Sequence, residues 1–330
     1  MLVPPQALPR RLSRRAALTA CVFSATVNVV GVVHAQQKFP TKPVRIVTVG
    51  AGSQNDLLAR MIGPKLSESW GQPIVVENRT GAGGALAASV VAKATPDGYT
   101  LLMLSNQFAI GAALHPNLPY DAVRDFAGVT QIGVATVVLV VPPSLGVKSV
   151  KELIALARAK PLVFSSSGAG SGTHMNGEMF RVAAGVKAVH VGFRSSAEAS
   201  VEVAAGRVQY SVLPLGPVLP FIRDNRVVAL AVANQRSPLL PDVPAMVEVL
   251  PNYERGGSFG LLAPAGTPRA VRQQISKEVA RILDLPEIKV QLQGMGFVPA
   301  PNTPEEFEKM VRVDIDMFIK MAKLAGLRAK

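Results

Sequence analysis

Two loops that join serine and glycine residues to the start of a helix are the stretches best suited to hold a small anion. The first, Val49–Arg60, reads VGAGSQNDLLAR, and the second, Val163–Phe180, reads VFSSSGAGSGTHMNGEMF. Glycine lets the backbone turn sharply and approach a ligand. The first turn of a helix offers unpaired N–H groups and the positive end of the dipole. Each loop alone is also compatible with an ordinary strand-to-helix turn, but the repeated design favours two loops that close on one anion.

Catalytic motifs are weak in this sequence. A serine hydrolase would need a base beside Ser167 or Ser171, and the pattern GxSxG is absent there. His174 is close in sequence, but a histidine at a helix start is more often packed or solvated than catalytic. The phosphate-binding pattern GxxxxGK[ST] and the dinucleotide-binding pattern GxGxxG are not completed either. We therefore expect no catalytic residue and no enzymatic activity.

The first 35 residues have the pattern of an export signal. Four arginines between residues 10 and 15 precede the apolar run Ala16–Val33, and Ala35 ends a small-residue cleavage site. The stretch SRRAAL resembles a twin-arginine signal, and a Sec signal also fits. An uncleaved membrane anchor or a lipoprotein signal at Cys21 is the alternative, but the run is short and most of it follows the cysteine. We expect a periplasmic protein that begins at Gln36.

Removal of this segment changes the chemistry of the chain. Residues 36–330 contain no cysteine, and their net charge is +9 instead of +13, because four arginines and no acids are lost. The basic residues are scattered, which favours anionic small molecules over nucleic acid. The histidines that remain, His115, His174 and His190, have no second ligand at metal spacing. We expect no metal, no cofactor and no nucleic-acid partner.

Strand and helix patterns alternate in the first third of the chain. Val44–Val49 is a run of apolar and β-branched residues, typical of a buried parallel strand, and apolar residues between Leu57 and Leu66 share one helix face. Ile74–Val76, Leu86–Ala94 and Tyr99–Leu104 then read as strand, helix and strand. This alternation predicts βαβ units and a parallel sheet.

The alternation continues in a second region. The long apolar stretch Ala127–Val141 is expected to cross into a second lobe, and Ser258–Ala263 to return from it. Thr267 and Thr303, each followed by proline, are predicted N-caps of the last helices. The elements expected between the two crossings are the strands Leu162–Phe164, Ala188–Val191, Arg207–Val212 and Val227–Val232 and the helices Val150–Ala159, Met175–Ala184 and Ala197–Ala205.

One stretch has a more specific pattern. Glu77–Leu102, ENRTGAGGALAASVVAKATPDGYTLL, closely resembles the signature of the Bug family, the TctC-like substrate-binding receptors of tripartite tricarboxylate transporters. Thr80 stands where the family usually has proline. Similar motifs at Pro43–Val47, Ser237–Pro244 and Leu262–Pro268 follow in the family's order, so the resemblance covers nearly the whole exported chain.

The resemblance implies a fold and a function. The fold is the type II periplasmic-binding-protein fold, two α/β lobes with a ligand cleft between them. Lobe 1 would comprise residues 36–137 and 257–330, and lobe 2 residues 138–256. The function would be an exported, monomeric receptor that captures a small carboxylate and delivers it to membrane transporter subunits. A ligand sensor for a signalling partner and a periplasmic serine hydrolase are the alternatives.

The resemblance also implies which residues bind the ligand. In the family, backbone amides and ordered water from both lobes hold the carboxylate, and water bridges suit varied ligands. Ser105 and Asn106, at the end of the third strand, are further candidates. Arg194 either pairs with a distal carboxylate or lies in solvent. The loop residues are Gly50, Ala51, Gly52, Ser53, Gln54, Asn55 and Asp56 in lobe 1 and Ser165, Ser166, Ser167, Gly168 and Thr173 in lobe 2, with Asp56 more suited to the helix dipole than to catalysis.

Two positions depart from the family pattern. Ser53 replaces the second glycine of a pair in the first loop, and its side chain would narrow the approach to the ligand. Leu213 stands where the family often has an acid, so an ammonium group would lose its partner. This wall of the site becomes apolar, which favours an apolar or aromatic carboxylate over an amino acid. The alternative is that Leu213 belongs to the core of lobe 2.

Overall fold

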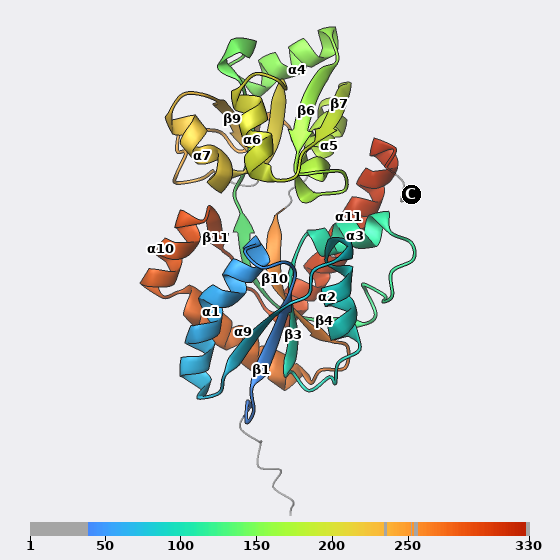
Figure 1. The fold of residues 1–330 in the computed structure, drawn as a ribbon, viewed down its shortest axis with the longest axis vertical. Helices are drawn as coiled ribbons and strands as arrows, with labels where there is room; N and C mark the ends of the chain where they lie inside the picture. The colour runs from blue at the N-terminus through green and yellow to red at the C-terminus, as the bar shows by residue number, and fades with distance from the viewer. Residues whose placement is uncertain (1–38, 234–235, 252, 254–256, 328–330) are drawn as a thin grey trace, which may run out of the picture. The chain divides into compact units, whose positions relative to one another are not determined.

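The strands of this protein form two sheets in its computed structural model, which describes residues 39–233, 236–251, 253 and 257–327. Residues Phe39–Lys330 make up one unit. The predicted signal peptide Met1–Ala35 and the expected first residue, Gln36, lie outside the described residues. Helices cover both faces of each sheet (Figure 1), which confirms the predicted α/β class.

The first sheet has six strands in the order β11-β4-β10-β3-β1-β2 within the described residues. Its strands are β1 (Val44–Thr48), β2 (Ile74–Asn78), β3 (Thr100–Ser105), β4 (Phe126–Ala135), β10 (Ser258–Pro264) and β11 (Phe297–Pro299). β1 pairs in parallel with β2 and β3, as the βαβ pattern predicts. β10 pairs antiparallel with β3 and β4, so the chain returns to this sheet near its end, as expected. We call this sheet with its helices lobe 1.

The second sheet has five strands in the order β7-β6-β8-β5-β9 over the same described ranges. Its strands are β5 (Val137–Val141), β6 (Leu162–Ser166), β7 (Ala188–Gly192), β8 (Tyr210–Pro214) and β9 (Val228–Val232). β6 is parallel to β7 and β8, whereas β5 is antiparallel to β8 and β9. We call this sheet with its helices lobe 2. The boundaries of the lobes at residues 137/138 and 256/257 stay predictions.

The side chains of the strands alternate between two cores. In β3, Leu101 and Met103 belong to one apolar cluster, and Leu102 and Leu104 belong to another on the opposite face. Successive side chains of a strand point to opposite faces, so a strand buried on both sides reads as a continuous apolar run. The run that made β3 visible in the sequence therefore reflects helices on both faces of the sheet.

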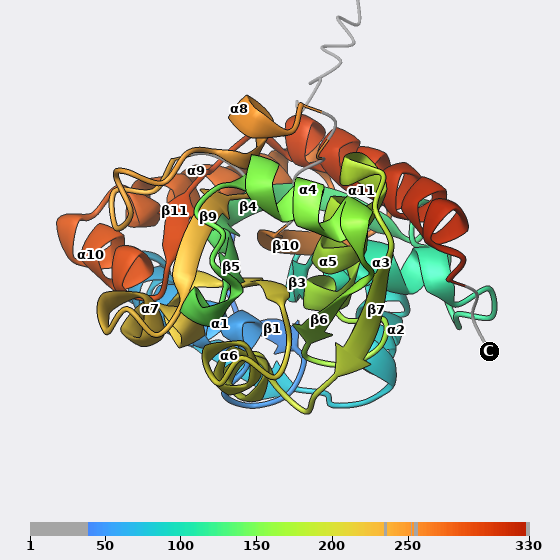
Figure 2. The ribbon, with the colours of Figure 1, turned by 90° about the horizontal axis from the view of Figure 1, so that it is seen from above.

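The helices of lobe 1 divide between these two faces. Residues of α1 and α9 belong to the cluster of Leu101 and Met103, and residues of α2, α3 and α11 to the cluster of Leu102 and Leu104. Figure 2 shows α11 and α9 from above. The bounds are α1 (Gln54–Trp70), η1 (Ala82–Gly84), α2 (Ala85–Ala92), α3 (Gln107–Leu114), α9 (Arg269–Leu283), α10 (Pro286–Gly294) and α11 (Pro304–Ala325). No helix among the described residues combines the length and the apolar character that crossing a membrane requires.

The helices of lobe 2 cover its sheet in the same way. Residues of α4 and α5 share a cluster with Leu139 and Val141, and residues of α6 and α7 share one with Val138 and Val140. The bounds are η2 (Pro143–Leu145), α4 (Val150–Ala159), α5 (Gly172–Ala184), α6 (Ser196–Ala204), α7 (Leu215–Arg223) and α8 (Met246–Val249). The predicted strand at Arg207 begins at Tyr210 instead. Arg207 N–H donates to the Glu202 carbonyl, so this residue lies in the turn that closes the end of α6.

The helix caps show where local sequence decides the structure and where it does not. Thr303 is the N-cap of α11 with Pro304 at the first helical position, as predicted, and it also forms a capping box with Glu306. Thr267 does not cap α9, contrary to the prediction. Its hydroxyl donates to the Pro264 carbonyl at 2.7 Å, and α9 begins after Pro268. The hydroxyl of Thr267 therefore binds a backbone carbonyl that precedes it and does not cap the helix that follows.

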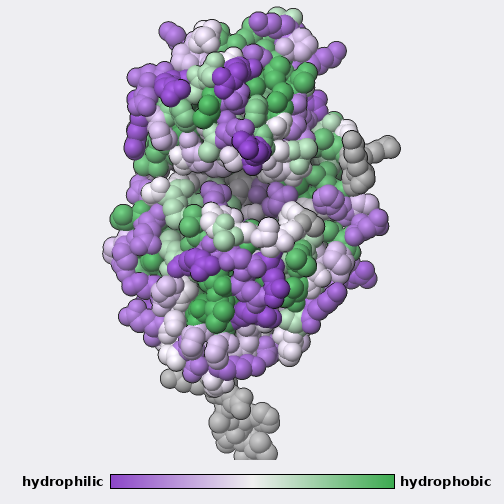
Figure 3. Space-filling model, viewed as in Figure 1, coloured by the Kyte–Doolittle hydropathy of each residue, from purple (hydrophilic) through white to green (hydrophobic). Residues whose placement is uncertain are grey.

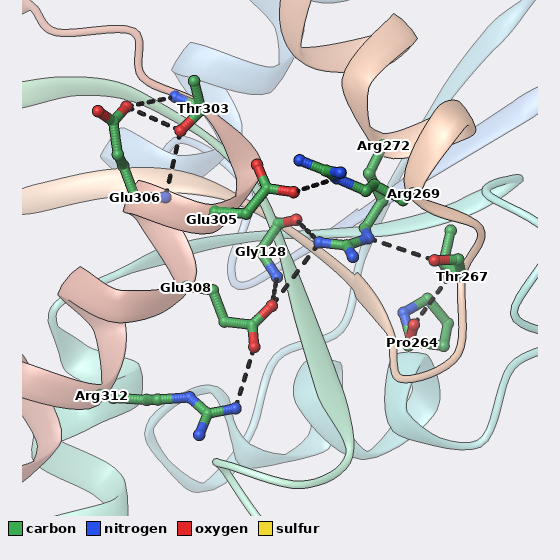
Figure 4. A network of polar contacts seen from close by, with 10 residues as sticks. All are labelled: Gly128, Pro264, Thr267, Arg269, Arg272, Thr303, Glu305, Glu306, Glu308 and Arg312. Atoms are coloured by element: carbon green, nitrogen blue, oxygen red, sulfur yellow. Dashed lines mark hydrogen bonds and ion pairs between the residues drawn. The ribbon is translucent and has the colours of Figure 1, made fainter.

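Gly128 in β4 lets α9 and α11 come close to the sheet (Figure 4). The Arg272 guanidinium donates to the Gly128 carbonyl at 2.9 Å, and Gly128 N–H donates to Glu308 at 3.4 Å. A Cβ at Gly128 would lie 2.5 Å from the Pro304 carbonyl oxygen and 2.7 Å from the Glu308 nitrogen. Both atoms belong to the backbone of α11, so the helix itself would have to move.

We expect Gly128→Ala to lower the free energy of unfolding by about 1–3 kcal/mol, the usual range for overpacking. Urea denaturation followed by circular dichroism measures this change. Gly294→Ala is the matched control, because a Cβ at Gly294 meets no atom within 4 Å and this residue ends helix α10. The control should be neutral or gain up to about 1 kcal/mol. Equal losses in the two variants would contradict the packing argument.

Candidate functional site

The first predicted loop lies between β1 and α1. Gly52 has φ 75°, a conformation that favours glycine, and its N–H donates to Asp56 Oδ2 at 2.9 Å. Ser53 is the N-cap of α1, and its hydroxyl accepts a hydrogen bond from Asp56 N–H at 3.2 Å. Ser53 therefore uses its side chain to cap the helix, which accounts for a serine where the family has glycine.

Asp56 braces this loop with a buried carboxylate. Besides Gly52, it accepts hydrogen bonds from Arg60 at 3.0 Å and from Asn78 at 2.8 Å. Asn78 also donates to the Val49 carbonyl, so the bracing reaches the end of β1. Burial opposes ionisation, but the hydrogen bonds from Gly52, Asn78 and Arg60 outweigh it and lower the pKa of Asp56. We assign Asp56 to loop geometry rather than to ligand contact.

The second predicted loop lies between β6 and α5. Ser171 caps α5, because its hydroxyl accepts from His174 N–H at 3.2 Å. The hydroxyl of Thr173 binds the Ser167 N–H and hydroxyl, both at 2.8 Å. These bonds fold the loop back onto the first turn of the helix.

Helices α1 and α5 begin in the same way. In each, a serine N-cap binds the N–H of the third helical residue, Asp56 or His174. The N–H groups of the first two helical residues have no hydrogen-bond partner within the described ranges. They belong to Gln54 and Asn55 in α1 and to Gly172 and Thr173 in α5. Each helix therefore presents two N–H groups and a dipole end to an anion.

The two residues that follow β3 contact the second loop. Asn106 lies beside Gly172, where a Cβ would be 3.5 Å from the Asn106 side-chain oxygen. Gln107, the first residue of α3, donates its side-chain amide to the Gly170 carbonyl at 3.2 Å. These two residues of lobe 1 contact the loop of lobe 2, so the structure brings the predicted Asn106 to the site.

A cavity of about 30 Å³ adjoins the first loop. Asn55, Ser105 and Gln107 supply polar atoms to its lining, and Phe108 and Tyr120 supply aromatic ones. Asn55 is 6% exposed, and its side-chain oxygen has no hydrogen-bond partner among the described residues. A cavity of this volume has room for a water molecule that donates to Asn55. On the face drawn in Figure 3, the surface is hollowed where the lobes meet, and both polar and apolar side chains border the hollow.

Four of the predicted ligand-binding residues do not line this candidate site: three are buried in strands, and one points into solvent. Ser165 and Ser166 are fully buried, and their hydroxyls bind the Ala199 carbonyl and the Gly168 backbone, respectively. Leu213 is fully buried in β8, opposite Val138. The Arg194 side chain is 92% exposed and pairs with Glu198 at 3.2 Å, which fits the solvated alternative. Of the other predicted residues, Gly50 and Ala51 form the turn before Gly52, and Ser105 lines the cavity.

The geometry gives little support to a hydrolase. Ser167 and Ser171 both hydrogen-bond to the Thr173 hydroxyl, and neither bonds to an imidazole nitrogen in the described part of the chain. Ser166 does bond to His190 Nε2 at 2.6 Å, but Ser166 is fully buried, so a substrate has no access to it. A nucleophile must reach its substrate as well as its base. Over the described residues, no cluster of three or more His, Cys, Asp or Glu side chains could hold a metal.

Sequence reasoning missed three contributors to the site. Gln107 and the Gly83-Gly84 pair line the cavity, and His190 supports the second loop through Ser166. Gln107 directly follows Ser105 and Asn106 at the carboxyl end of a parallel strand, where ligands of α/β proteins usually bind. That position was a usable signal. His190 had none, because its role depends on a pairing between β7 and β6.

Comparisons with known proteins agree with this geometry. The family model described as "Tripartite tricarboxylate transporter family receptor" matches residues 58–324. BugT of Bordetella pertussis is 30% identical over 316 residues, which cover 94% of this chain and 97% of BugT.

Two solved structures are similar over most of the chain. "R. palustris Rpa4515 with adipate" is 33% identical with a TM-score of 0.75, and the match covers 88% of this chain and 100% of that one. "MatC (Rpa3494) from Rhodopseudomonas palustris with bound malate" is 29% identical with a TM-score of 0.69, covering 86% and 99%.

We expect Asp56→Asn to lower the free energy of unfolding at pH 7 by about 1.5–3 kcal/mol, because hydrogen bonds to a buried charge are lost. The folded-state pKa of Asp56 is lowered, so its contribution is present above the usual value of 3.8 and disappears as pH falls through the folded-state pKa. The difference between wild type and variant should therefore shrink in acid. Denaturant titrations at several pH values measure it.

Glu198→Gln is the matched control. Glu198 is the third residue of α6, as Asp56 is of α1. Each carboxylate accepts from a backbone N–H four residues earlier and pairs with an arginine, Arg194 for Glu198 and Arg60 for Asp56. The side chain of Glu198, however, is partly exposed. Its loss should matter much less. A control effect as large as that of Asp56→Asn would argue against burial as the cause.

Proposed function

This chain belongs to the tripartite tricarboxylate transporter receptor family, and we propose that it is an exported receptor that captures a small carboxylate between its lobes. Members of this family are periplasmic binding proteins, and the two α/β lobes described here have their fold. The receptor would release its ligand to the membrane subunits of a tripartite tricarboxylate transporter. It would act as a monomer and catalyse no reaction.

The observation that carries the proposal is the matched start of α1 and α5. Four backbone N–H groups, those of Gln54, Asn55, Gly172 and Thr173, have no partner among the described residues. A carboxylate between the helices would accept hydrogen bonds from both lobes and meet two positive dipole ends. Neither lobe alone offers this full set of donors, so the ligand favours the closed arrangement.

Water is the second element of the proposed site. Asn55 lines a cavity with room for a water molecule, and its buried side-chain oxygen needs a donor. That water could pass the hydrogen bond on to the ligand, and its position could adapt to ligands of different length. Such a site selects the carboxylate group more strongly than the rest of the molecule. The adipate and malate in the two similar structures have this group in common.

The proposed export of the receptor rests on the sequence before the described residues. We propose cleavage after Ala35 by either a Sec or a twin-arginine route, which would leave Gln36 as the first residue. Terminal sequencing of the protein recovered from the periplasm tests this, and an intact Met1 or a lipid-modified Cys21 would overturn it.

Calorimetric titration with adipate and malate, joined to small-angle scattering, tests the proposed function. We expect saturable binding of at least one of these acids and a smaller radius of gyration at saturation, because closure completes the donor set. Asn55→Leu should weaken the binding by about tenfold, since the water would lose a buried partner.

Asn176→Leu is the matched control for that variant. Asn176 is also a buried asparagine whose side-chain oxygen has no partner among the described residues, but it does not line the cavity. It should alter stability without altering affinity. Absence of binding to a panel of aliphatic and aromatic carboxylates, or binding without any compaction, would count against the proposed receptor.

Leu213→Asp tests whether this residue faces the ligand or belongs to the core of lobe 2. If Leu213 faces the ligand, Leu213→Asp should admit 2-aminoadipate and weaken adipate by roughly two decades, because a buried unpaired carboxylate costs several kcal/mol. If Leu213 is only a core residue, as its complete burial in β8 also allows, both ligands lose affinity equally and the melting temperature falls. Calorimetry with the matched pair of acids separates the two outcomes.

A further inference from the structure

Two histidines of lobe 2 stack on one another behind the second loop. The ring centroids of His174 in α5 and His190 in β7 are 3.7 Å apart, with 20° between the ring planes. Phe164 of β6 lies against both rings, with centroid distances of 6.1 and 5.0 Å. His174 is buried and His190 half-buried. The function proposed above assigns no role to this pair.

Each of the two rings holds one end of the same turn. Gly170 N–H donates to His174 Nδ1 at 3.0 Å. His190 Nε2 binds the Ser166 hydroxyl at 2.6 Å, and that hydroxyl oxygen accepts from Gly168 N–H at 3.1 Å. A backbone N–H can only donate a hydrogen bond, so Nδ1 of His174 must carry no proton in this arrangement.

Gly170 joins this turn to lobe 1. Its N–H is held by His174, and its carbonyl accepts the side-chain amide of Gln107 at 3.2 Å. Gly170 has φ 73°, a conformation that leaves the peptide orientation dependent on the contacts around it. The protonation state of one imidazole is therefore linked, through a single residue, to a contact between the lobes.

We propose that neutral His174 is a positioning residue of this receptor: it holds Gly170 where Gln107 can bridge the lobes, and a proton on Nδ1 releases that bridge and the ligand. The part that concerns the ligand rests on the proposed function, whereas the link between His174 and Gln107 does not. When Nδ1 is protonated it becomes a donor that faces the Gly170 N–H, so the turn must move.

The surroundings keep His174 neutral. Burial, the neighbouring His190 and Arg181 lower the pKa of His174 to about 4, and burial also lowers the pKa of His190. Glu178 Oε1 lies 3.9 Å from His174 Nε2, but the Glu178 carboxylate is paired with Arg181 at 2.6 Å. Since the pKa in the held state lies below the ordinary 6.5, the hold is complete above pH 6.5 and weakens as pH falls toward 4.

The groups that face the pair from other elements do not offset this effect. From lobe 1, α3 contributes Leu114 and Gln107 near Gly170, and neither titrates. Lys320 of α11 lies beside Met179 and Val182, further along α5. The titratable and charged side chains around the two rings are therefore Glu178 and Arg181 of α5 and Tyr210 of β8, whose ring stacks on Phe164.

Histidine titration by nuclear magnetic resonance tests the link without any ligand. The protein is labelled with ¹³C-histidine, and the His174 signal is assigned by its loss in His174→Asn. We expect wild-type His174 to titrate well below pH 6. Gln107→Ala should raise the pKa of His174 by about half a unit, because Gly170 without the Gln107 bridge moves away more easily when Nδ1 is protonated. A wild-type pKa near 6.5, or the same pKa in Gln107→Ala, would overturn the proposal.

Adipate binding at pH 7 and pH 4 tests the consequence for the ligand. In His174→Asn, the amide oxygen can accept from Gly170 N–H but does not titrate. Adipate's own carboxyl groups titrate equally in both experiments, so the ratio between the two proteins isolates His174. We expect wild type to lose about twofold more affinity at pH 4 than the variant does, because about half of His174 is protonated at a pKa of about 4. Parallel losses would overturn the proposal.

The two measurements also separate this proposal from the proposed function. If neither adipate nor any other carboxylate binds at pH 7, the receptor function fails, but the response of the His174 titration to Gln107→Ala still decides the positioning role. If His174→Asn does not fold, the titrations of wild type and Gln107→Ala still decide it, with His115 and His190 assigned by their own single substitutions.

Discussion

The first N–H groups of a helix have no carbonyl partner within that helix, and both loops of the site are organised around this constraint. In α1 and α5 a serine N-cap satisfies the third N–H and leaves the first two. Polar side chains or carbonyl groups of the loops could have accepted hydrogen bonds from those N–H groups. Instead, Asp56 in lobe 1 and the histidine pair in lobe 2 hold the loops, and the first two N–H groups of each helix keep no partner among the described residues.

The sequence predicted the architecture well where local patterns decide it. Apolar runs identified the strands because both faces of the sheets are covered, and Thr303 with Pro304 identified the start of α11. Predictions failed where a contact outside the local pattern competed. Thr267 binds the Pro264 carbonyl instead of capping α9, and Arg207 lies in the turn that closes the end of α6 instead of starting β8. Such competition depends on three-dimensional proximity, which a single sequence does not contain.

Both predicted loops form strand-to-helix turns in the structure, but several of their side chains do not lie where residue type alone suggested. Residue type indicated the serines of the second loop, yet Ser165 and Ser166 lie in β6 and are fully buried, because a strand places part of the motif inside the sheet. Arg194 had suitable chemistry but pairs with Glu198 in solvent. Gln107 and His190 act through contacts with residues 63 and 24 positions away, Gly170 and Ser166. Separations of this length appear only once the sheets are assembled.

The two lobes hold their loops by opposite means that have the same electrostatic result. Asp56 stays ionised, but its charge is neutralised locally by Arg60 and by the Asn78 and Gly52 N–H groups. Burial lowers the pKa of both His174 and His190, and His190 and Arg181 further oppose a proton on His174, so the two rings stay neutral. Among the described residues, neither the loop residues 50–56 and 165–173 nor the residues that line the cavity include a lysine or an arginine. In the proposed receptor, the attraction for an anion would therefore come from oriented N–H groups and helix dipoles rather than from net charge, and such a site would accept carboxylates of different size without a matching cation for each.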